Sequence, residues 1–329
     1  MGTFANRLGT RFLVVTVVPN VLLIGYIGFL IAAGAPAQSP SLARALKALD
    51  HLTVNRIIAI LLGVLIISIA SHSLQIPLIQ LLEGYWWGLP FGQKLAKHAI
   101  QRFRTELASA NDELDKAAGS GEQNWAMKNS ARQARFRKDW LPEYEEDLRP
   151  TALGNTLWTG ETTAGNRYGL DLNLALPRII PSMSSSILAE LSDRRNQLDA
   201  AARLCVTAGV ATVASVGLLI WQGPWLFLAL ALYLLCWASY RAAVAAARGF
   251  SVTLAAAVDL HHLQLFDALS LERPANITQE ISHNTTLTKL FHGDYLSQVD
   301  KNVLRYIALA DKEKSATASP EPDRGFAGP

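Results

Sequence analysis

Charged residues are scarce in this chain of 329 amino acids, where Asp, Glu, Lys and Arg together make up 17% of the sequence. Soluble globular proteins carry about 25%. Hydrophobic residues make up 50% of the chain, and they lie in blocks rather than being spread evenly. Blocks of this kind are typical of membrane-spanning helices. The net charge of +3 is too small to indicate a nucleic-acid partner.

Cysteines and catalytic motifs are also scarce. The two cysteines, Cys205 and Cys236, lie inside apolar blocks, so neither a disulfide framework nor a cysteine metal site is expected. The sequence has no phosphate-binding loop, dinucleotide fingerprint, zinc-protease motif or serine-hydrolase motif. His261 and His262 are adjacent, but Asp267 lies outside the i+3/i+4 spacing that would place it on their helix face. We therefore expect no metal and no cofactor, and the sequence favours a protein without enzymatic activity.

Four apolar blocks are long enough to cross a membrane as helices. The first two occupy residues 12–34 and 57–82, and a hydrocarbon layer of about 30 Å needs about 20 helical residues. The third and fourth, at 204–221 and 225–247, are joined by three residues and predict a tight helical hairpin. The first block is longer than the core of a cleaved signal peptide, which has about 7–15 apolar residues.

Lys and Arg are distributed unevenly between the two ends of these spans. One set of ends carries Arg7, Arg11, Lys94, Lys97, Arg102, Arg194, Arg195, Arg203, Arg241 and Arg248. The opposite set carries Arg44, Lys47 and Arg56. Because cytoplasmic flanks carry the excess of Lys and Arg, we expect a multi-pass protein of the cell inner (plasma) membrane. Both termini would then be cytoplasmic, with residues 1–11 inside and 35–56 outside.

The remaining segments predict an all-α membrane protein with a helical cytoplasmic part. Residues 83–181 would form a cytoplasmic helical domain. Within 182–272, which has Pro only in the hairpin, the last two spans would continue as a long antiparallel helical stalk into the cytoplasm. Residues 273–311 predict a further helical segment, opened by a cap at Asn276 with Gln279. The polar tail at 312–329 has the composition of a disordered segment.

Small residues recur at every fourth position in the last two spans. Thr207, Ala211 and Ser215 follow this spacing in the third, and Ala238, Ala242 and Ala246 follow it at the end of the fourth. Small residues at this spacing let helix backbones approach closely. The pattern fits packing within the hairpin and packing between copies of the chain equally well.

Polar residues inside the first two spans form a candidate intramembrane site. The residues are Asn20, Ser68, His72 and Gln75. Polar groups are costly in a bilayer and are often functional there. The second span also contains Pro77, which is expected to kink the helix. The set would either hold helices together through hydrogen bonds or line a hydrated path.

Residues 149–171, RPTALGNTLWTGETTAGNRYGLD, combine glycines with charged residues. We interpret Gly160 and Gly165 as turn residues. Four charged or aromatic side chains, with Glu83 from the end of the second span, form a candidate cytoplasmic network because buried charges need partners. The network residues are Glu83, Glu161, Arg167, Tyr168 and Asp171.

Two further groups are expected to lie at the membrane surface. The aromatic residues at the span ends are suited to the headgroup layer; they are Tyr85, Trp86, Trp87, Trp221 and Trp225. A run of cations offers a contact for anionic lipid; it consists of Arg132, Arg135, Arg137 and Lys138.

The stretch LLEGYWWG after the second span, followed by RPTALGNTLWTGE and RYGLD before the third, resembles a family of multi-pass bacterial inner-membrane proteins common in actinobacteria. The resemblance covers about residues 57–182 and is strongest in those short motifs. It implies an inner-membrane location and a cytoplasmic domain between paired spans. It implies no activity, so no residue receives a catalytic role from it.

Our first functional hypothesis is a membrane-anchored scaffold, assembly component or effector-type component. Its helical cytoplasmic domain would bind a protein partner or a second copy of the chain. The first alternative is a channel or transporter lined by polar residues of the first two spans. The second is a membrane-bound enzyme of unknown reaction.

Overall fold

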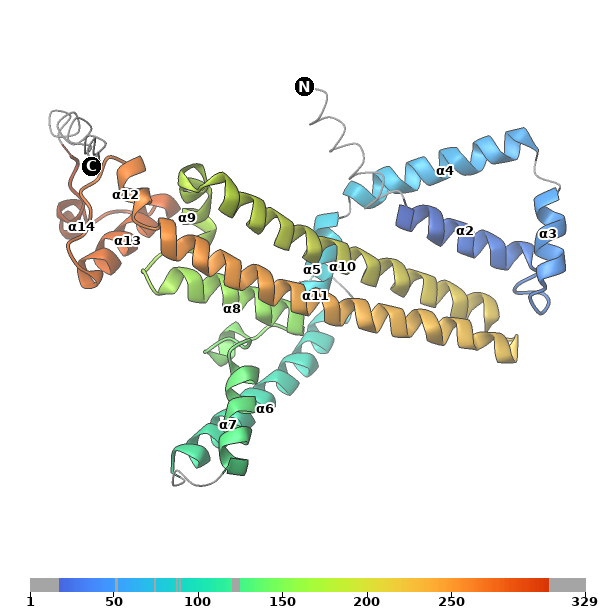
Figure 1. Cartoon of the computed structure of the whole chain (residues 1–329), viewed down its shortest axis with the longest axis horizontal. Coiled ribbons are helices and arrows are strands. Elements are labelled where there is room, and N and C mark those ends of the chain that lie inside the picture. The colour runs from blue at the N-terminus through green and yellow to red at the C-terminus, as the bar shows by residue number, and fades with distance from the viewer. Residues whose placement is uncertain are drawn as a thin grey trace, which may run out of the picture. The chain divides into compact units, whose positions relative to one another are not determined.

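The structure is a computed structural model that describes residues 18–50, 53–73, 75–86, 88, 90–119 and 125–307 (Figure 1). Every extended regular element within these ranges is a helix, and the only β pairing among them is an isolated bridge between Leu271 and Tyr306. The prediction of an all-helical chain is therefore confirmed. The chain divides into two compact units, unit 1 with residues 1–159 and 191–251, and unit 2 with residues 160–190 and 252–329.

Unit 1 contains the apolar helices and a long hairpin of polar helices. Its elements are α2 (Val18–Ala32), α3 (Leu42–Asp50), α4 (Val54–Ser73), α5 (Gln75–Glu83), α6 (Gly92–Ala118), α7 (Trp125–Lys138), the 3-10 turn η2 (Glu145–Asp147), the start of α8 (Ala152–Asn166), the 3-10 turn η4 (Gly223–Trp225) and most of α10 (Ser185–Leu219) and α11 (Leu226–His261). Helices α6 and α7 pack against each other along their length (Figure 1).

Two helices, α10 and the one formed by η4 and α11, are long and apolar enough to cross a membrane by length and composition. The first includes the predicted third span up to Leu219, and the second includes the predicted fourth span. Within unit 1 the Sγ atoms of Cys205 and Cys236 lie 3.7 Å apart, and Arg195 lies 5.7 Å from the ring centre of Phe250. Both cysteines are free thiols. Shorter apolar helices occur at Val18–Ala32 and Ile57–Ala70, inside the predicted first and second spans.

Two described helices lie in the predicted second span. Helix α4 is described up to Ser73 and α5 from Gln75, and Leu74 between them lies outside the described residues. Pro77 lies in α5 and has no N–H to donate to the Ser73 carbonyl four residues earlier. The kink at Pro77 stays a prediction.

The small residues of the two long helices have different surroundings. Ala211 and Ser215 of α10 are buried, and the Ser215 hydroxyl shares a 2.8 Å hydrogen bond with the Tyr26 hydroxyl of α2. Ala238 and Ala242 of α11 are exposed. Ala211 and Ser215 thus serve packing inside the chain, whereas Ala238 and Ala242 face outward and Ala246 is half-buried.

Unit 2 consists of the end of α8, α9 (Leu172–Ile179), the 3-10 turn η3 (Ile180–Ser182), the start of α10, the end of α11, α12 (Gln264–Ala268), α13 (Ile277–His292) and α14 (Gln298–Val303). Its core contains buried side chains from α9, α11, α12 and α13, among them Ile179, Ala257, Phe266 and Leu287. The Asn276 side chain accepts a 2.9 Å hydrogen bond from the Gln279 N–H, which confirms the predicted cap of α13.

Two local predictions were wrong. The helix expected to continue to residue 272 ends at His261, because the chain turns there to bury Leu265 and Phe266, both 0% exposed, in the unit 2 core. Gly160 was interpreted as a turn residue, but it lies inside α8, which runs to Asn166. Gly165 likewise lies inside α8, one residue before its end, and a Cβ atom at Gly165 would collide with the Leu170 carbonyl oxygen where the chain folds back.

Candidate functional site

The two motif stretches of unit 1 meet where α5 ends and α8 begins. Gly84 has φ +98°, a left-handed conformation that favours glycine, and it lies directly against the ring of Pro150. Gly154, in the first turn of α8, faces the backbone carbonyl of Glu83 so closely that a Cβ atom would overlap it. We call this contact between residues 83–85 and 149–158 the motif junction.

Both the side chain and the backbone of Arg149 make contacts within the motif junction. Its guanidinium lies 4.3 Å from the ring centre of Trp158 and 5.5 Å from that of Tyr85. The fully buried Asn155 side chain accepts from the Arg149 N–H at 2.6 Å and donates to the Arg149 carbonyl at 3.1 Å. The Tyr240 hydroxyl of α11 accepts from the Leu153 N–H at 3.3 Å. These contacts are all internal, which indicates that the junction has a structural role.

Unit 2 contains a cluster of polar side chains around His262, which we call the histidine cluster. The His262 ring stacks on the Tyr168 ring with centroids 3.9 Å apart and an angle of 18° between the planes. The His262 Nδ1 atom lies 2.5 Å from the Glu280 carboxylate. The side chains of His262 and Glu280 are only 13% and 7% exposed, so the contact is largely shielded from water.

Asp259 extends the histidine cluster toward the surface. The Tyr168 hydroxyl donates to Asp259 at 2.9 Å, and Arg167 lies 3.6 Å from the same carboxylate. Burial of the phenol, and then its hydrogen bond to Asp259, raises the pKa of Tyr168 above its usual value. Tyr168 therefore stays neutral, and its hydroxyl donates a hydrogen bond to Asp259. A tyrosine in this state holds its neighbours in place through the hydrogen bond, and tyrosine is also one of the residue types that act as general acids.

Two residues of α13 lie beneath the histidine cluster. The Asn284 side chain is 0% exposed and donates to the Tyr168 carbonyl at 2.8 Å. The next residue toward the N-terminus, His283, is 6% exposed, and its ring centre lies 6.0 Å from that of Phe266. Burial lowers the pKa of His283, against a smaller raising effect of Glu272. His283 is thus held as a neutral side chain inside unit 2.

The predicted cytoplasmic network is distributed over both units. Arg167 and Tyr168 meet at Asp259, as described above. Asp171 instead caps α9, where it accepts from the Asn173 N–H at 3.0 Å and lies 3.7 Å from His292. Glu83 belongs to the motif junction of unit 1, and Glu161 lies half-buried on α8 in unit 2.

Glu280 was missed because its contact with His262 joins residues 18 positions apart. A helical-periodicity test would have found it. Glu280, His283, Asn284 and Leu287 follow the i, i+3, i+4, i+7 spacing of one helix face, and all four are buried.

The candidate intramembrane residues are described in part. Asn20 and Ser68 are 7% and 0% exposed, and the Ser68 hydroxyl has no hydrogen-bond partner among the described residues. The side chains of His72 and Gln75 lie outside the described part of the structure. Among the predicted interface anchors, Tyr85 and Trp221 are exposed, Trp86 donates to the Leu81 carbonyl at 2.8 Å, and Trp225 packs near Phe227 with ring centres 6.4 Å apart. Trp87 lies outside the described residues.

The predicted basic run differs from residue to residue in its surroundings. Arg137 is neutralised by Glu113 at 2.7 Å, and Glu113 also accepts from Ser130 at 3.0 Å. The hydrogen bond from Arg137, and then the one from Ser130, hold the pKa of Glu113 below its usual value. Arg132 and Arg135 line a cavity between α6 and α7 instead. Lys138 ends α7 and is half-buried.

Among the described residues, no group of three or more His, Cys, Asp or Glu side chains is arranged to hold a metal ion. The histidine cluster brings together two ring systems and two carboxylates, but not in a metal-binding arrangement. A scan against models of protein families, a search of curated proteins and a search of solved structures each find no match to this chain.

Proposed function

We propose that this chain is a non-enzymatic scaffold, anchored in a membrane by its apolar helices, that presents unit 2 to a protein partner. The observation that carries the proposal is that α11 combines a segment apolar enough to cross a membrane with a segment that belongs to unit 2. Its 36 residues form one unbroken helix that is apolar enough to cross a membrane. Its last turns belong to unit 2, where Ala257, at 1% exposed, lies in the core.

The distribution of charge supports a cytoplasmic position for unit 2. Arg241 and Arg248 lie on α11 between its most apolar part and the unit 2 residues, and cationic flanks face the cytoplasm. In the proposed topology α2 and α4 are the first two spans, and α10 and α11 are the third and fourth. Both termini and the α6–α7 hairpin are then cytoplasmic, and the turn at Gln222 is external.

The surface of α11 within unit 2 supports a docking role. Val252 and Leu260 are 61% and 68% exposed, and Ala256 between them is also exposed. The three residues lie at i, i+4 and i+8 and form one apolar stripe, which we call the docking stripe. The opposite side of the helix, with Leu254 and Val258, is buried. Exposed apolar stripes on helices are typical of sites that bind another helix.

The proposed scaffold is tested by photocrosslinking in the native membrane. A benzophenone amino acid at position 256 is expected to form an adduct of one defined mass with a protein, either another copy of the chain or a different partner. The substitutions Val252→Asp and Leu260→Asp are expected to remove the adduct, and the control Ser282→Asp, at another exposed position of unit 2, is expected to retain it. Adducts with lipid only, or an adduct that survives both stripe substitutions, contradict the proposal.

The buried positions of Asn20 and Ser68 favour helix packing over the channel hypothesis, because pore-lining polar groups need contact with water. The scaffold predicts no ion flux through the reconstituted protein. A flux that His72→Ala abolishes would replace the scaffold by a channel.

A further inference from the structure

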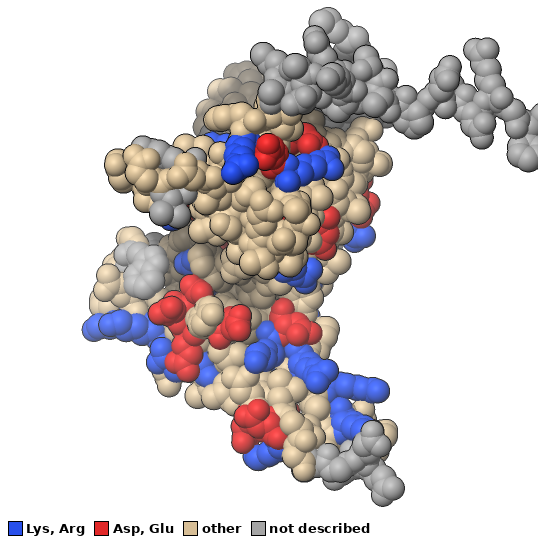
Figure 2. All heavy atoms as spheres, turned by 90° about the vertical axis from the view of Figure 1, so that its left-hand side faces the viewer, with Lys and Arg blue, Asp and Glu red and all other residues tan. Residues whose placement is uncertain are grey.

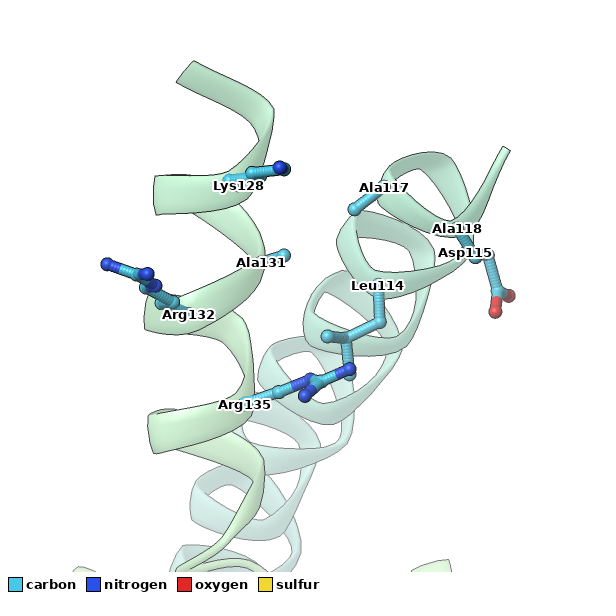
Figure 3. A pocket seen from close by; sticks show the side chains of 8 residues that line it. All are labelled: Leu114, Asp115, Ala117, Ala118, Lys128, Ala131, Arg132 and Arg135. Atoms are coloured by element: carbon cyan, nitrogen blue, oxygen red, sulfur yellow. The ribbon is translucent and has the colours of Figure 1, made fainter. Parts of the chain in front are cut away.

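The end of α6 and the start of α7 line a cavity that lies outside the docking stripe. Its volume is about 540 Å³, within the range of about 300–1,000 Å³ that is usual for small-molecule sites. Its lining consists of Leu114, Asp115, Ala117 and Ala118 from α6, and Lys128, Ala131, Arg132 and Arg135 from α7 (Figure 3).

The cations of this cavity are concentrated on α7. Lys128, Arg132 and Arg135 lie at i, i+4 and i+7, which places them along one side of the helix. Figure 3 shows Lys128 and Arg135 directed toward α6, while the Arg132 side chain, which also lines the cavity, extends away from α6. Asp115 is the one acidic lining residue, and its carboxylate points away from α7 (Figure 3). The cavity therefore presents positive charge.

This positive charge has no counterpart among the described residues, in contrast to the neighbouring cations of the same hairpin. Arg137 is paired with Glu113 at 2.7 Å, Lys116 with Asp112 at 2.5 Å, and Arg104 with Glu145 at 2.7 Å. None of the described carboxylates lies within ion-pair distance of Lys128, Arg132 or Arg135, whose side chains are exposed. In Figure 2 several Lys and Arg side chains lie in the lower part of the view, with Asp and Glu side chains among them.

The apolar lining of the cavity consists of Leu114, Ala117 and Ala118 of α6 and Ala131 of α7 (Figure 3). A ligand that matches both sides carries a phosphate for the cations and an apolar part for the alanines. Arg is well suited to bind phosphate oxygens, and Lys supplies a compact charge for the same group. We propose that this cavity, which we call the hairpin cavity, binds the headgroup of an anionic phospholipid.

This assignment rests on the membrane anchoring proposed above, which makes the bilayer a source of phosphate for the hairpin cavity. Helix α6 starts shortly after Tyr85 and Trp86, which are expected at the membrane surface, and its 27 residues span about 40 Å. A hairpin that lies along the membrane surface would bring the cavity to the headgroups. Each Lys or Arg close to an anionic surface strengthens its attraction about fivefold, so three contribute about a hundredfold in a binding constant.

The test uses the full chain in nanodiscs that contain phosphatidylcholine with a minority of phosphatidylglycerol. Cys205 and Cys236 are replaced by Ala, and a small fluorophore is attached to Ala117→Cys in the cavity wall. Bromine atoms, which quench the fluorophore on contact, are carried by the phosphatidylglycerol in one sample and by an equal amount of phosphatidylcholine in the other. The lipid composition is otherwise identical, so a difference in quenching reports the preference at this cavity.

We expect stronger quenching when phosphatidylglycerol carries the bromine. The variant Lys128→Gln, Arg132→Gln, Arg135→Gln is expected to lose the difference. The matched control Lys94→Gln, Lys97→Gln, Arg102→Gln removes the same charge from exposed positions of α6 and is expected to keep it. Equal quenching in the two samples overturns the proposal, as does a difference lost equally in both variants. Displacement of the lipid by soluble glycerol phosphate assigns the cavity to a free phosphate ester and also overturns it.

Discussion

The contact of Gly154 with Glu83 allows a sharp test of the motif junction. A Cβ atom at Gly154 would overlap a backbone carbonyl, which cannot rotate away as a side chain does. Gly→Ala in a helix interior otherwise stabilises by about 0.5–1 kcal/mol through helix propensity. Overpacking of a close contact costs about 1–3 kcal/mol. We therefore expect Gly154→Ala to destabilise unit 1 by up to about 2.5 kcal/mol after the propensity gain is subtracted.

The matched control is Gly249→Ala in α11. A Cβ atom there would meet the Arg194 side chain at 3.7 Å, an ordinary van der Waals distance. This variant is expected to be neutral or more stable than the wild type. Unfolding of both purified variants in the same detergent, followed by intrinsic fluorescence against temperature, gives the comparison. If Gly154→Ala unfolds at the same temperature as Gly249→Ala, the close approach of α5 and α8 is refuted.

Two further predictions concern Arg149 and His283. Arg149→Ala removes the stacking on Trp158 and Tyr85 and is expected to cost about 1–2 kcal/mol of stability. Arg149→Lys is expected to be intermediate, because it keeps the charge and loses the planar group. An Ala variant as stable as the wild type in the same thermal assay would contradict the contacts described at the motif junction. Because burial lowers the pKa of His283 below 6.5, the unfolded chain binds more protons than the folded chain once the pH falls below that value. The stability of unit 2 is thus fully present above pH 6.5 and declines as the pH falls; hydrogen exchange of α13 measures the decline, and a His283→Leu variant that declines equally would show that another group is responsible.

The sequence allowed the helices to be predicted far better than their ends. Blocks of apolar residues and the three-residue joint at 222–224 were sufficient to predict two long helices with a turn between them, since helix length and composition are local properties. The cap at Asn276 was equally local. The end of α11 at His261 was not predictable in this way. It depends on the burial of Leu265 and Phe266 against helices that are distant in the sequence.

The sequence identified some residues of the candidate site but not the residues that they contact. Arg167 and Tyr168 stood out as charged and aromatic residues in a glycine-rich stretch, but both contact Asp259, which lies 91 residues after Tyr168. Their pairing depends on how α11 and the end of α8 fold together in unit 2. Likewise, Arg137 resembled its neighbours Arg132 and Arg135 in sequence, and only the contact of α6 with α7 shows that Glu113 neutralises it. Residue type predicts chemistry, and tertiary contacts decide which charges stay available.

The membrane topology is the central claim of the proposed function, and cysteine labelling in intact cells tests it most directly. In a chain with Cys205 and Cys236 replaced by Ala, a membrane-impermeant thiol reagent is expected to label Gln222→Cys at the turn between α10 and α11. The same reagent is expected to label Ala118→Cys at the end of α6 and Ser282→Cys in unit 2 only after the membrane is permeabilised. Labelling of Ser282→Cys in intact cells, protection of Gln222→Cys, or recovery of the chain in the soluble fraction would contradict the account.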